Sequence, residues 1–235
     1  MDESAVEELR EVVGASLYLV SGEYLRRGDD LQYNGQRPGP GWHGHGSFSR
    51  WLRVLGPNGL SRLRLWKPRW LDPKAKVTCH SRPPDELGRV SVCSLTFVLL
   101  LYGYLQAAQG AARHHAVLDV LENAVTRRTI LRWMPRACAR AKEIQQAMRL
   151  AVIERSEPRP VERLFPRGLS PPDSLGQRNW RDPQAATILW RGLAILITGA
   201  VKLKVPAAIL LAEARGRSAT PQSPPGTLGD RKSVV

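Results

Sequence analysis

Hydrophobic residues recur at helical spacing in several stretches of the chain. Residues 4–20 begin with apolar positions three or four apart, although the end of this stretch is equally typical of a strand. Residues 185–200 and 207–214 are also predicted to be helical, with Pro206 between them. A longer amphipathic helix is indicated by a stripe of apolar residues, Ala137, Ala141, Ile144, Met148 and Ala151, which recur at spacings of three and four.

The pattern changes to alternation between residues 47 and 67. Leu63 and Leu65 are separated by arginines, as in short strands that bury one face. Residues 34–46 hold too much glycine and proline for a regular element and are predicted to form a loop. We therefore expect a small basic β segment in residues 47–89.

These patterns predict a mainly α fold, a helix-turn-helix bundle with a small basic β segment in the N-terminal half and a disordered C-terminal tail. The length of 235 residues suits one domain or two small ones. The expected segments are an acidic amphipathic element (1–33), a Gly/Pro loop (34–46), the β segment (47–89), a helical domain with the helix-turn-helix (90–155), a Pro-rich connector (156–183), C-terminal helices (184–214) and the tail (215–235).

One uncharged stretch, Val90 to Ala112, is about long enough to cross a ~30 Å hydrocarbon layer as a helix. Polar residues and glycines dilute it, and its densest part, Leu95 to Leu105, has the length of a buried core element. A core helix is the favoured interpretation. A single membrane span at residues 90–112 stays open as the alternative.

Residues 126–133 predict the opening of a DNA-reading helix. Thr126 can act as N-cap, because its hydroxyl can accept a hydrogen bond from a backbone N–H of the first turn. Ile130 and Trp133 then share one side of the helix. Arg128 and Arg132, four residues apart, share another side that can face phosphates or guanine edges.

The residues before Thr126 predict the first helix of the pair. Val117, Leu118 and Leu121 supply an apolar stripe, and residues 122–125 have the length of a helix-turn-helix corner. Pro135 is expected to end or kink the second helix after about nine residues. The alternative is an ordinary helical hairpin whose arginines are only solvated.

The charge of the chain favours a polyanionic partner or an anionic membrane surface. It carries 35 Lys and Arg against 21 Asp and Glu, a formal net charge of +14. Residues 50–76 hold eight basic residues against one acid, Asp72, and the predicted DNA-reading helix lies in a second basic block. Three cysteines are too few for a disulfide framework, and the acidic N-terminus is unlike a signal peptide, so a cytoplasmic location is expected.

Two short motifs carry a resemblance to a known family. Residues 46–51, Gly-Ser-Phe-Ser-Arg-Trp, look like the glycine-aromatic-arginine turn of a zinc ribbon, and residues 126–133 look like a recognition helix. The chain thus resembles insertion-sequence-associated (transposase-like) helix-turn-helix proteins, with a degenerate zinc-ribbon-like segment that lacks Cys-x-x-Cys knuckles. The resemblance implies DNA binding connected with transposition, carried here by Arg127, Arg128, Thr129 and Arg132.

Chemistry of other kinds has little support in the sequence. The imidazoles and thiols of His43, His45, Cys79, His80 and Cys93 are at spacings that match no zinc knuckle, so no metal is expected. There is no phosphate-binding loop, no metalloprotease motif and no nucleophile elbow. We therefore expect a binding protein that is not an enzyme and needs no cofactor.

The expected function is binding of double-stranded DNA, without catalysis and without a small-molecule substrate. The helix that begins at Thr126 would enter a major groove, and Arg50, Arg53, Arg62 and Arg64 would hold the backbone. A separate transposase or a second copy of the chain is a further expected partner. Two alternatives remain, a single-span membrane-associated protein and a decayed remnant of a mobile element.

Among the aromatic residues near these arginines, Trp51 and Trp66 are expected to face the core, because strand spacing would turn both toward one buried side.

Overall fold

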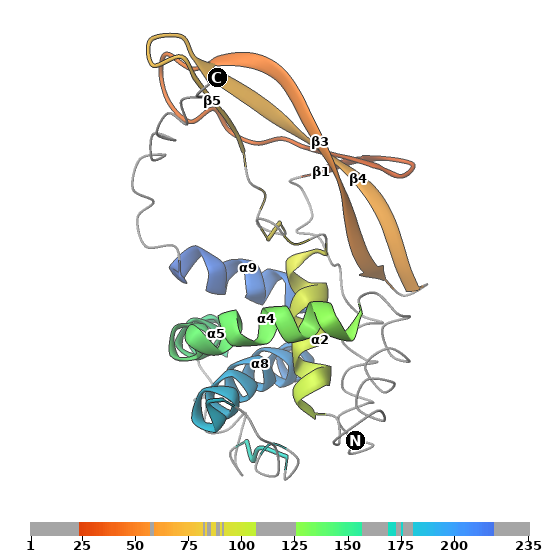
Figure 1. The fold of residues 1–235 in the computed structure, drawn as a ribbon, viewed down its shortest axis with the longest axis vertical. Helices are drawn as coiled ribbons and strands as arrows, with labels where there is room; N and C mark the ends of the chain where they lie inside the picture. The colour runs from red at the N-terminus through yellow and green to blue at the C-terminus, as the bar shows by residue number, and fades with distance from the viewer. Residues whose placement is uncertain are drawn as a thin grey trace, which may run out of the picture.

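A five-stranded sheet and a group of helices make up the described part of the chain (Figure 1). The fold is mixed α/β, so the prediction of a mainly α bundle is wrong. The computed structural model describes residues 24–56, 59–81, 83, 86, 87, 90, 92–106, 126–156, 169–172, 175 and 181–218.

The centre of the sheet is β4 (Gly59–Asp72). One edge of β4 pairs antiparallel with β3 (His43–Gly56), and the other pairs parallel with β2 (Asp30–Tyr33) and antiparallel with β5 (Val77–His80). β1 (Tyr24–Arg27) extends the sheet by pairing antiparallel with β2. The end of the β3–β4 hairpin that lies beside β5 is far from the helices, whereas its other end comes down toward them, where Arg53 bridges to Val92 (Figure 1).

The β region is larger than the sequence indicates, because each strand of the long hairpin contains 14 residues. Residues 43–46 lie in β3, so the prediction of a loop over 34–46 is wrong for this end of it. His43 and Gly44 pair with residues of β4. Glycine has a low propensity for strands, so this end of β3 is held in the sheet by its hydrogen bonds to β4.

The two faces of the hairpin differ in chemistry. Leu52 pairs with Leu63, and both are buried in the core together with Leu65, as the alternating pattern predicts. Trp51, by contrast, is 42% exposed and Trp66 is half-buried. The prediction of a core position for Trp51 is wrong, because neighbouring strand residues point to opposite faces and Leu52 already occupies the inner one.

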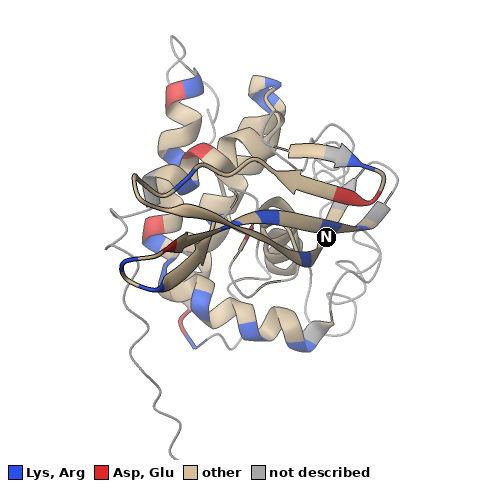
Figure 2. Ribbon diagram, turned by 90° about the horizontal axis from the view of Figure 1, so that it is seen from above, with Lys and Arg blue, Asp and Glu red and all other residues tan. Residues whose placement is uncertain are grey.

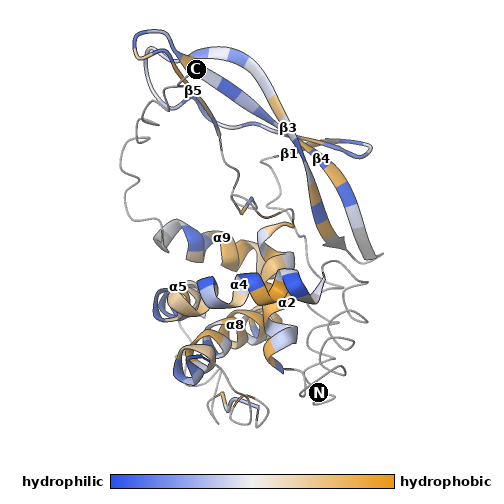
Figure 3. Cartoon of the chain, viewed as in Figure 1, coloured by the Kyte–Doolittle hydropathy of each residue, from blue (hydrophilic) through white to orange (hydrophobic). Residues whose placement is uncertain are grey.

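The helix α2 (Ser94–Gln106) lies in the middle of the helical layer. Eleven of its 13 residues are buried, and Figure 3 shows hydrophobic residues concentrated here and in α8. The Cys93 sulfur accepts a hydrogen bond from the Thr96 backbone N–H at 3.4 Å, which satisfies one of the free donors at the helix start. The core interpretation of this stretch is confirmed for residues 94–106.

Two consecutive helices carry the predicted apolar stripe. α4 (Arg127–Ala139) is followed by α5 (Ala141–Ser156), with Arg140 in a non-helical conformation between them. Four of the five stripe residues are buried and Ile144 is half-buried. Pro135 lies inside α4 and does not end it, so this alternative of the prediction is wrong, and a kink at Pro135 stays a prediction. Proline has no N–H to donate to the backbone carbonyl four residues earlier in the helix. Because Pro135 is exposed, water can hydrate that carbonyl instead.

The last two helices of the described chain are α8 (Pro183–Leu203) and α9 (Ala207–Ser218), on either side of Pro206, as predicted. α8 starts early, because the Asp182 carboxylate accepts a hydrogen bond from the Ala185 N–H at 2.8 Å and Pro183 fits the first turn. Gly192 brings α8 close to α5, since a Cβ at this position would lie 2.7 Å from the Gln145 Cα.

One helix in the described residues, α8, is long and apolar enough to cross a membrane, and most of its length is buried inside the fold. A core helix in a folded domain meets the same criterion. α2 is shorter within the described residues, and residues 107–112 of the predicted span lie outside them.

Several predictions lie outside the described residues. They concern the N-terminal element before residue 24, the helix and corner at 111–125, most of the Pro-rich connector and the tail after residue 218.

Candidate nucleic-acid interface

The outer face of the β3–β4 hairpin gathers basic and aromatic side chains. Trp51 pairs with Arg64, and two residues further along Arg53 pairs with Arg62, so all four point to the same side of the sheet. We call Trp51, Arg53, Arg62, Arg64 and Trp66 the Arg–Trp face.

The rings hold the guanidinium groups in place on this face. The Arg62 Cζ lies 4.3 Å from the centroid of the Trp51 ring, and the Arg64 Cζ lies 5.1 Å from it. Arg64 is also 5.6 Å from the centroid of Trp66. A cation–π contact orders a guanidinium without neutralising its charge, so the N–H groups at its edge stay available to an anion.

The charge of the hairpin is strongly positive. β3 and β4 together contain six Lys and Arg against one acid, Asp72. Figure 2 shows basic positions repeating along the sheet with few acidic ones between them. The Asp30 carboxylate lies 3.8 Å from the Arg64 Nε, and both side chains are more than two-fifths exposed. A solvated pair of this kind is weak and neutralises little of the charge of Arg64.

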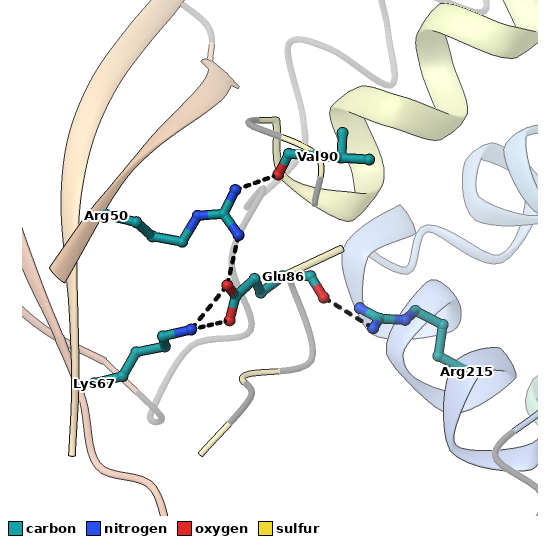
Figure 4. A network of polar contacts seen from close by, with 5 residues as sticks. All are labelled: Arg50, Lys67, Glu86, Val90 and Arg215. Carbon is teal, nitrogen blue, oxygen red and sulfur yellow. Dashed lines mark hydrogen bonds and ion pairs between the residues drawn. The ribbon is translucent and has the colours of Figure 1, made fainter. Parts of the chain in front are cut away.

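Arg50 does not belong to the Arg–Trp face, so the prediction that it contacts the DNA backbone together with Arg53, Arg62 and Arg64 is wrong. It points inward, where its Nη1 donates to a Glu86 carboxylate oxygen at 2.7 Å and its Nη2 donates to the Val90 carbonyl at 2.6 Å (Figure 4). Strand alternation explains the difference, because Arg50 is an odd number of residues away from both Trp51 and Arg53.

Glu86 is the centre of a buried ionic cluster that joins the sheet to the helices (Figure 4). Its two carboxylate oxygens accept from the Lys67 Nζ at 2.8 and 2.6 Å, and its backbone carbonyl accepts from the Arg215 Nη2 of α9 at 3.1 Å. The Lys67 and Glu86 side chains are at most 3% exposed. These groups therefore hold the sheet against the helices.

The start of α4 agrees with the predicted helix opening. Thr126 is the N-cap residue with an extended backbone, but its hydroxyl lies 3.1 Å from the Thr129 hydroxyl and makes no cap bond. Ile130 is buried and Trp133 packs on Phe97, with ring centroids 4.8 Å apart, so the predicted buried side is confirmed. Thr129 is half-buried and bonded to Thr126, which leaves it poorly placed to assist a contact.

A row of arginines follows the opposite side of α4. Arg128 and Arg132 are exposed, and Arg136, which was not among the predicted contacts, continues the row one turn further. It was missed because the helix was expected to end at Pro135. The side chain of Arg127 is outside the described residues.

A pocket of about 580 Å³ opens on the same side of the sheet as the Arg–Trp face. Trp66 belongs to both, so the pocket begins where the Arg–Trp face ends. No local motif indicates it, because its walls come from four strands. Its lining includes Leu25, Arg27, Asp30, Gln32, Tyr33, Asn34, Gly35, Gly46, Ser47, Trp66, Lys67, Pro68 and Trp70.

The residues considered for a metal are not assembled into a site. Within the described ranges, no three His, Cys, Asp or Glu side chains lie together as a metal would require. Cys93 is buried beside Thr96, and His80 stacks on Phe48 with ring centroids 5.1 Å apart. Burial raises the pKa of the Cys79 thiol, which disfavours the thiolate that a metal needs.

Comparison of the chain with protein-family models, with curated proteins and with solved structures gives no match.

Proposed function

We propose that this protein binds nucleic acid, and duplex DNA in particular, through the Arg–Trp face of the β3–β4 hairpin. The observation that carries the proposal is the stacking of Arg62 and Arg64 on one exposed tryptophan, Trp51, with Arg53 beside them. A packed core does not require any of these side chains on this face.

The shape of the hairpin suits the proposed partner. β2 pairs with β4 only from Arg64 to Trp66, so the part of the hairpin that carries Arg53 and Arg62 is a two-stranded ribbon. A two-stranded ribbon fits the major groove of B-DNA, which is about 12 Å wide, and arginine can bond phosphates or guanine edges there. The inner face is fixed by leucines and by the ionic cluster of Glu86, so the hairpin is held on a rigid base. Preorganised arginines lose less entropy on binding than free ones.

The arginine row of α4 supplies a second contact in this proposal. Arg128, Arg132 and Arg136 are exposed on a helix that contains no acidic residue. They belong to the helical layer, whereas the Arg–Trp face is on the sheet (Figure 1). The resemblance to insertion-sequence proteins favours DNA as the polyanion, and a connection with transposition is part of the proposal on that basis alone.

The test is the affinity of purified protein for a labelled duplex at fixed low salt. Replacing Arg53, Arg62 and Arg64 with Gln should weaken binding at least tenfold. The matched control replaces Lys142, Arg149 and Arg191 with Gln, because these exposed residues of α5 and α8 remove the same charge elsewhere. Equal losses in both variants would show unspecific attraction and contradict the proposal.

The contribution of α4 is tested separately with Arg128→Gln, Arg132→Gln and Arg136→Gln together. A further loss of binding on top of the hairpin variant would support two contact surfaces. Unchanged affinity in the α4 variant would remove α4 from the interface and leave the hairpin as the contact.

An anionic membrane is the competing polyanion, since α8 has the length and composition of a span. Vesicles with and without anionic lipid, offered in competition with duplex DNA, separate the two. Displacement of DNA by anionic vesicles at equal charge concentration would favour the membrane.

A further inference from the structure

We propose that the pocket at the end of the Arg–Trp face binds one unstacked nucleobase of the nucleic acid that the arginines hold. The inference rests on the proposed function and goes beyond it, because it names a base-binding site and a preferred substrate, a strand with an unpaired nucleotide.

The pocket arises where β3 departs from regular pairing. The register of β3 against β4 shifts between Gly44 and Ser47, and Gly46 in this bulge has a φ of +79°. A bulge bends its strand, and only glycine adopts this backbone conformation at low cost. A Cβ at Gly46 would meet nothing within 4 Å, so this side of the pocket is open space.

Two tryptophans of β4 supply flat apolar walls. Trp66 is held under Arg64, and the indole N–H of Trp70 donates to the Ser81 hydroxyl at 3.1 Å. Ser81 is held in turn by donating to the Gln36 carbonyl at 3.3 Å. Rings fixed in this way offer a stacking surface at little entropic cost, and stacking of a base on an aromatic side chain is worth about 1–3 kcal/mol.

Polar groups line the pocket beside these rings. Asp30 and Gln32 belong to β2, where they pair with Arg64 and Trp66 of β4. A carboxylate only accepts hydrogen bonds, whereas the Gln32 amide both donates and accepts. This set suits the edge of a base that carries an amino group. Arg27, exposed at the rim, is placed to meet a phosphate.

The pocket and the Arg–Trp face form one path along the sheet. Arg64 contacts Trp51, Trp66 and Asp30, so it lies between the phosphate-binding arginines and the pocket. The volume of about 580 Å³ is within the usual range for small-molecule sites and holds a single nucleotide. A strand held at Arg62 and Arg64 would therefore present its next unpaired base to Trp66.

The experiment compares two labelled duplexes that differ by one bulged 2-aminopurine. The protein should bind the bulged duplex about tenfold more tightly than the fully paired one. Trp70→Leu, which removes a pocket wall outside the Arg–Trp face, should remove this preference and keep the affinity for the paired duplex. Ser47→Trp, which fills the pocket and keeps both wall rings, should do the same. Phe48→Leu is the control, since Phe48 is exposed and outside the pocket lining.

The outcomes separate this inference from the proposed function. If the bulge gives no preference, or if the preference survives both pocket variants, the pocket does not bind a base, whatever the hairpin arginines do. If 2-aminopurine nucleoside monophosphate binds as tightly as the bulged duplex, the site takes a free nucleotide and the inference is wrong. Weaker binding of both duplexes in the arginine variant, with the preference lost only in the pocket variants, supports both.

Discussion

The Lys67 Nζ lies 2.6 and 2.8 Å from the two carboxylate oxygens of Glu86, and neither side chain is more than 3% exposed. Together with Arg50 this pair gives the inner face of the sheet two cations and one anion. Removing one partner of a buried ion pair leaves the other charge buried without compensation.

We expect Glu86→Gln to lower the free energy of unfolding by about 3–5 kcal/mol, because Lys67 and Arg50 lose their carboxylate. Urea denaturation followed by circular dichroism measures the change. Glu143→Gln is the control, since Glu143 pairs with Arg140 on the surface and should cost about 0–1 kcal/mol. Similar losses in the two variants would show that the cluster does not hold the sheet on the helices.

Contact between α5 and α8 depends on Gly192. An added Cβ would lie 2.7 Å from the backbone Cα of Gln145, so Gly192→Ala must push the helices apart. We expect this to lower the free energy of unfolding by about 1–3 kcal/mol. Gly216→Ala in α9 is the matched control, since a Cβ there meets nothing within 4 Å and alanine gains up to about 1 kcal/mol in a helix. The melting temperature measured by thermal denaturation should therefore fall for Gly192→Ala and rise for Gly216→Ala. A higher melting temperature for Gly192→Ala would contradict the close contact between α5 and α8.

Replacement of Pro135 should stabilise the protein. Alanine restores the N–H that proline lacks inside α4, and a proline in a helix interior costs about 3 kcal/mol. Pro135→Ala is expected to raise the melting temperature. Pro206→Ala should give no such gain, because Pro206 precedes α9 and interrupts no helix. A lower melting temperature for Pro135→Ala would mean that α4 ends earlier than the structure shows.

The reactivity of Cys138 should depend on Asp182. Burial and the negative charge of Asp182 raise the pKa of the Cys138 thiol above its ordinary value of 9.0. Since the folded pKa is the higher one, folding stability should fall as the pH rises above about 9, where the unfolded thiol ionises first.

Asp182→Asn keeps an N-cap residue for α8 and removes the charge. The pH midpoint of Cys138 alkylation, measured by mass spectrometry, should move down in this variant. Cys79 in the same sample is the reference, because burial alone raises its pKa. An unchanged midpoint for Cys138 would rule out the effect of Asp182.

Local patterns predicted the elements whose partners are close in sequence or purely apolar. The start of α4 at Thr126, its buried Ile130 and the inward leucines of β4 all follow from spacing within a few residues. The division of α8 and α9 at Pro206 follows from proline chemistry.

Long-range partners explain what the sequence did not show. Arg50 and Lys67 are of the same residue types as the surface cations, and the carboxylate that pairs with them inside, that of Glu86, is 36 and 19 residues away in the sequence. Trp51 is apolar enough for the core, yet the register with Arg64 places it outside. The pocket at Trp66 requires four strands to be paired correctly, which no local window contains.

The salt dependence of duplex binding tests the central proposal most directly, because the slope of log affinity against log salt counts the phosphates that are neutralised. When Arg53, Arg62 and Arg64 are all replaced with Gln, we predict that this slope is shallower than that of the wild type by about 0.9 for each phosphate contact that is lost. The Lys142, Arg149 and Arg191 control should keep the wild-type slope. An identical slope in the hairpin variant and the wild type would contradict the assignment of the Arg–Trp face as the nucleic-acid interface.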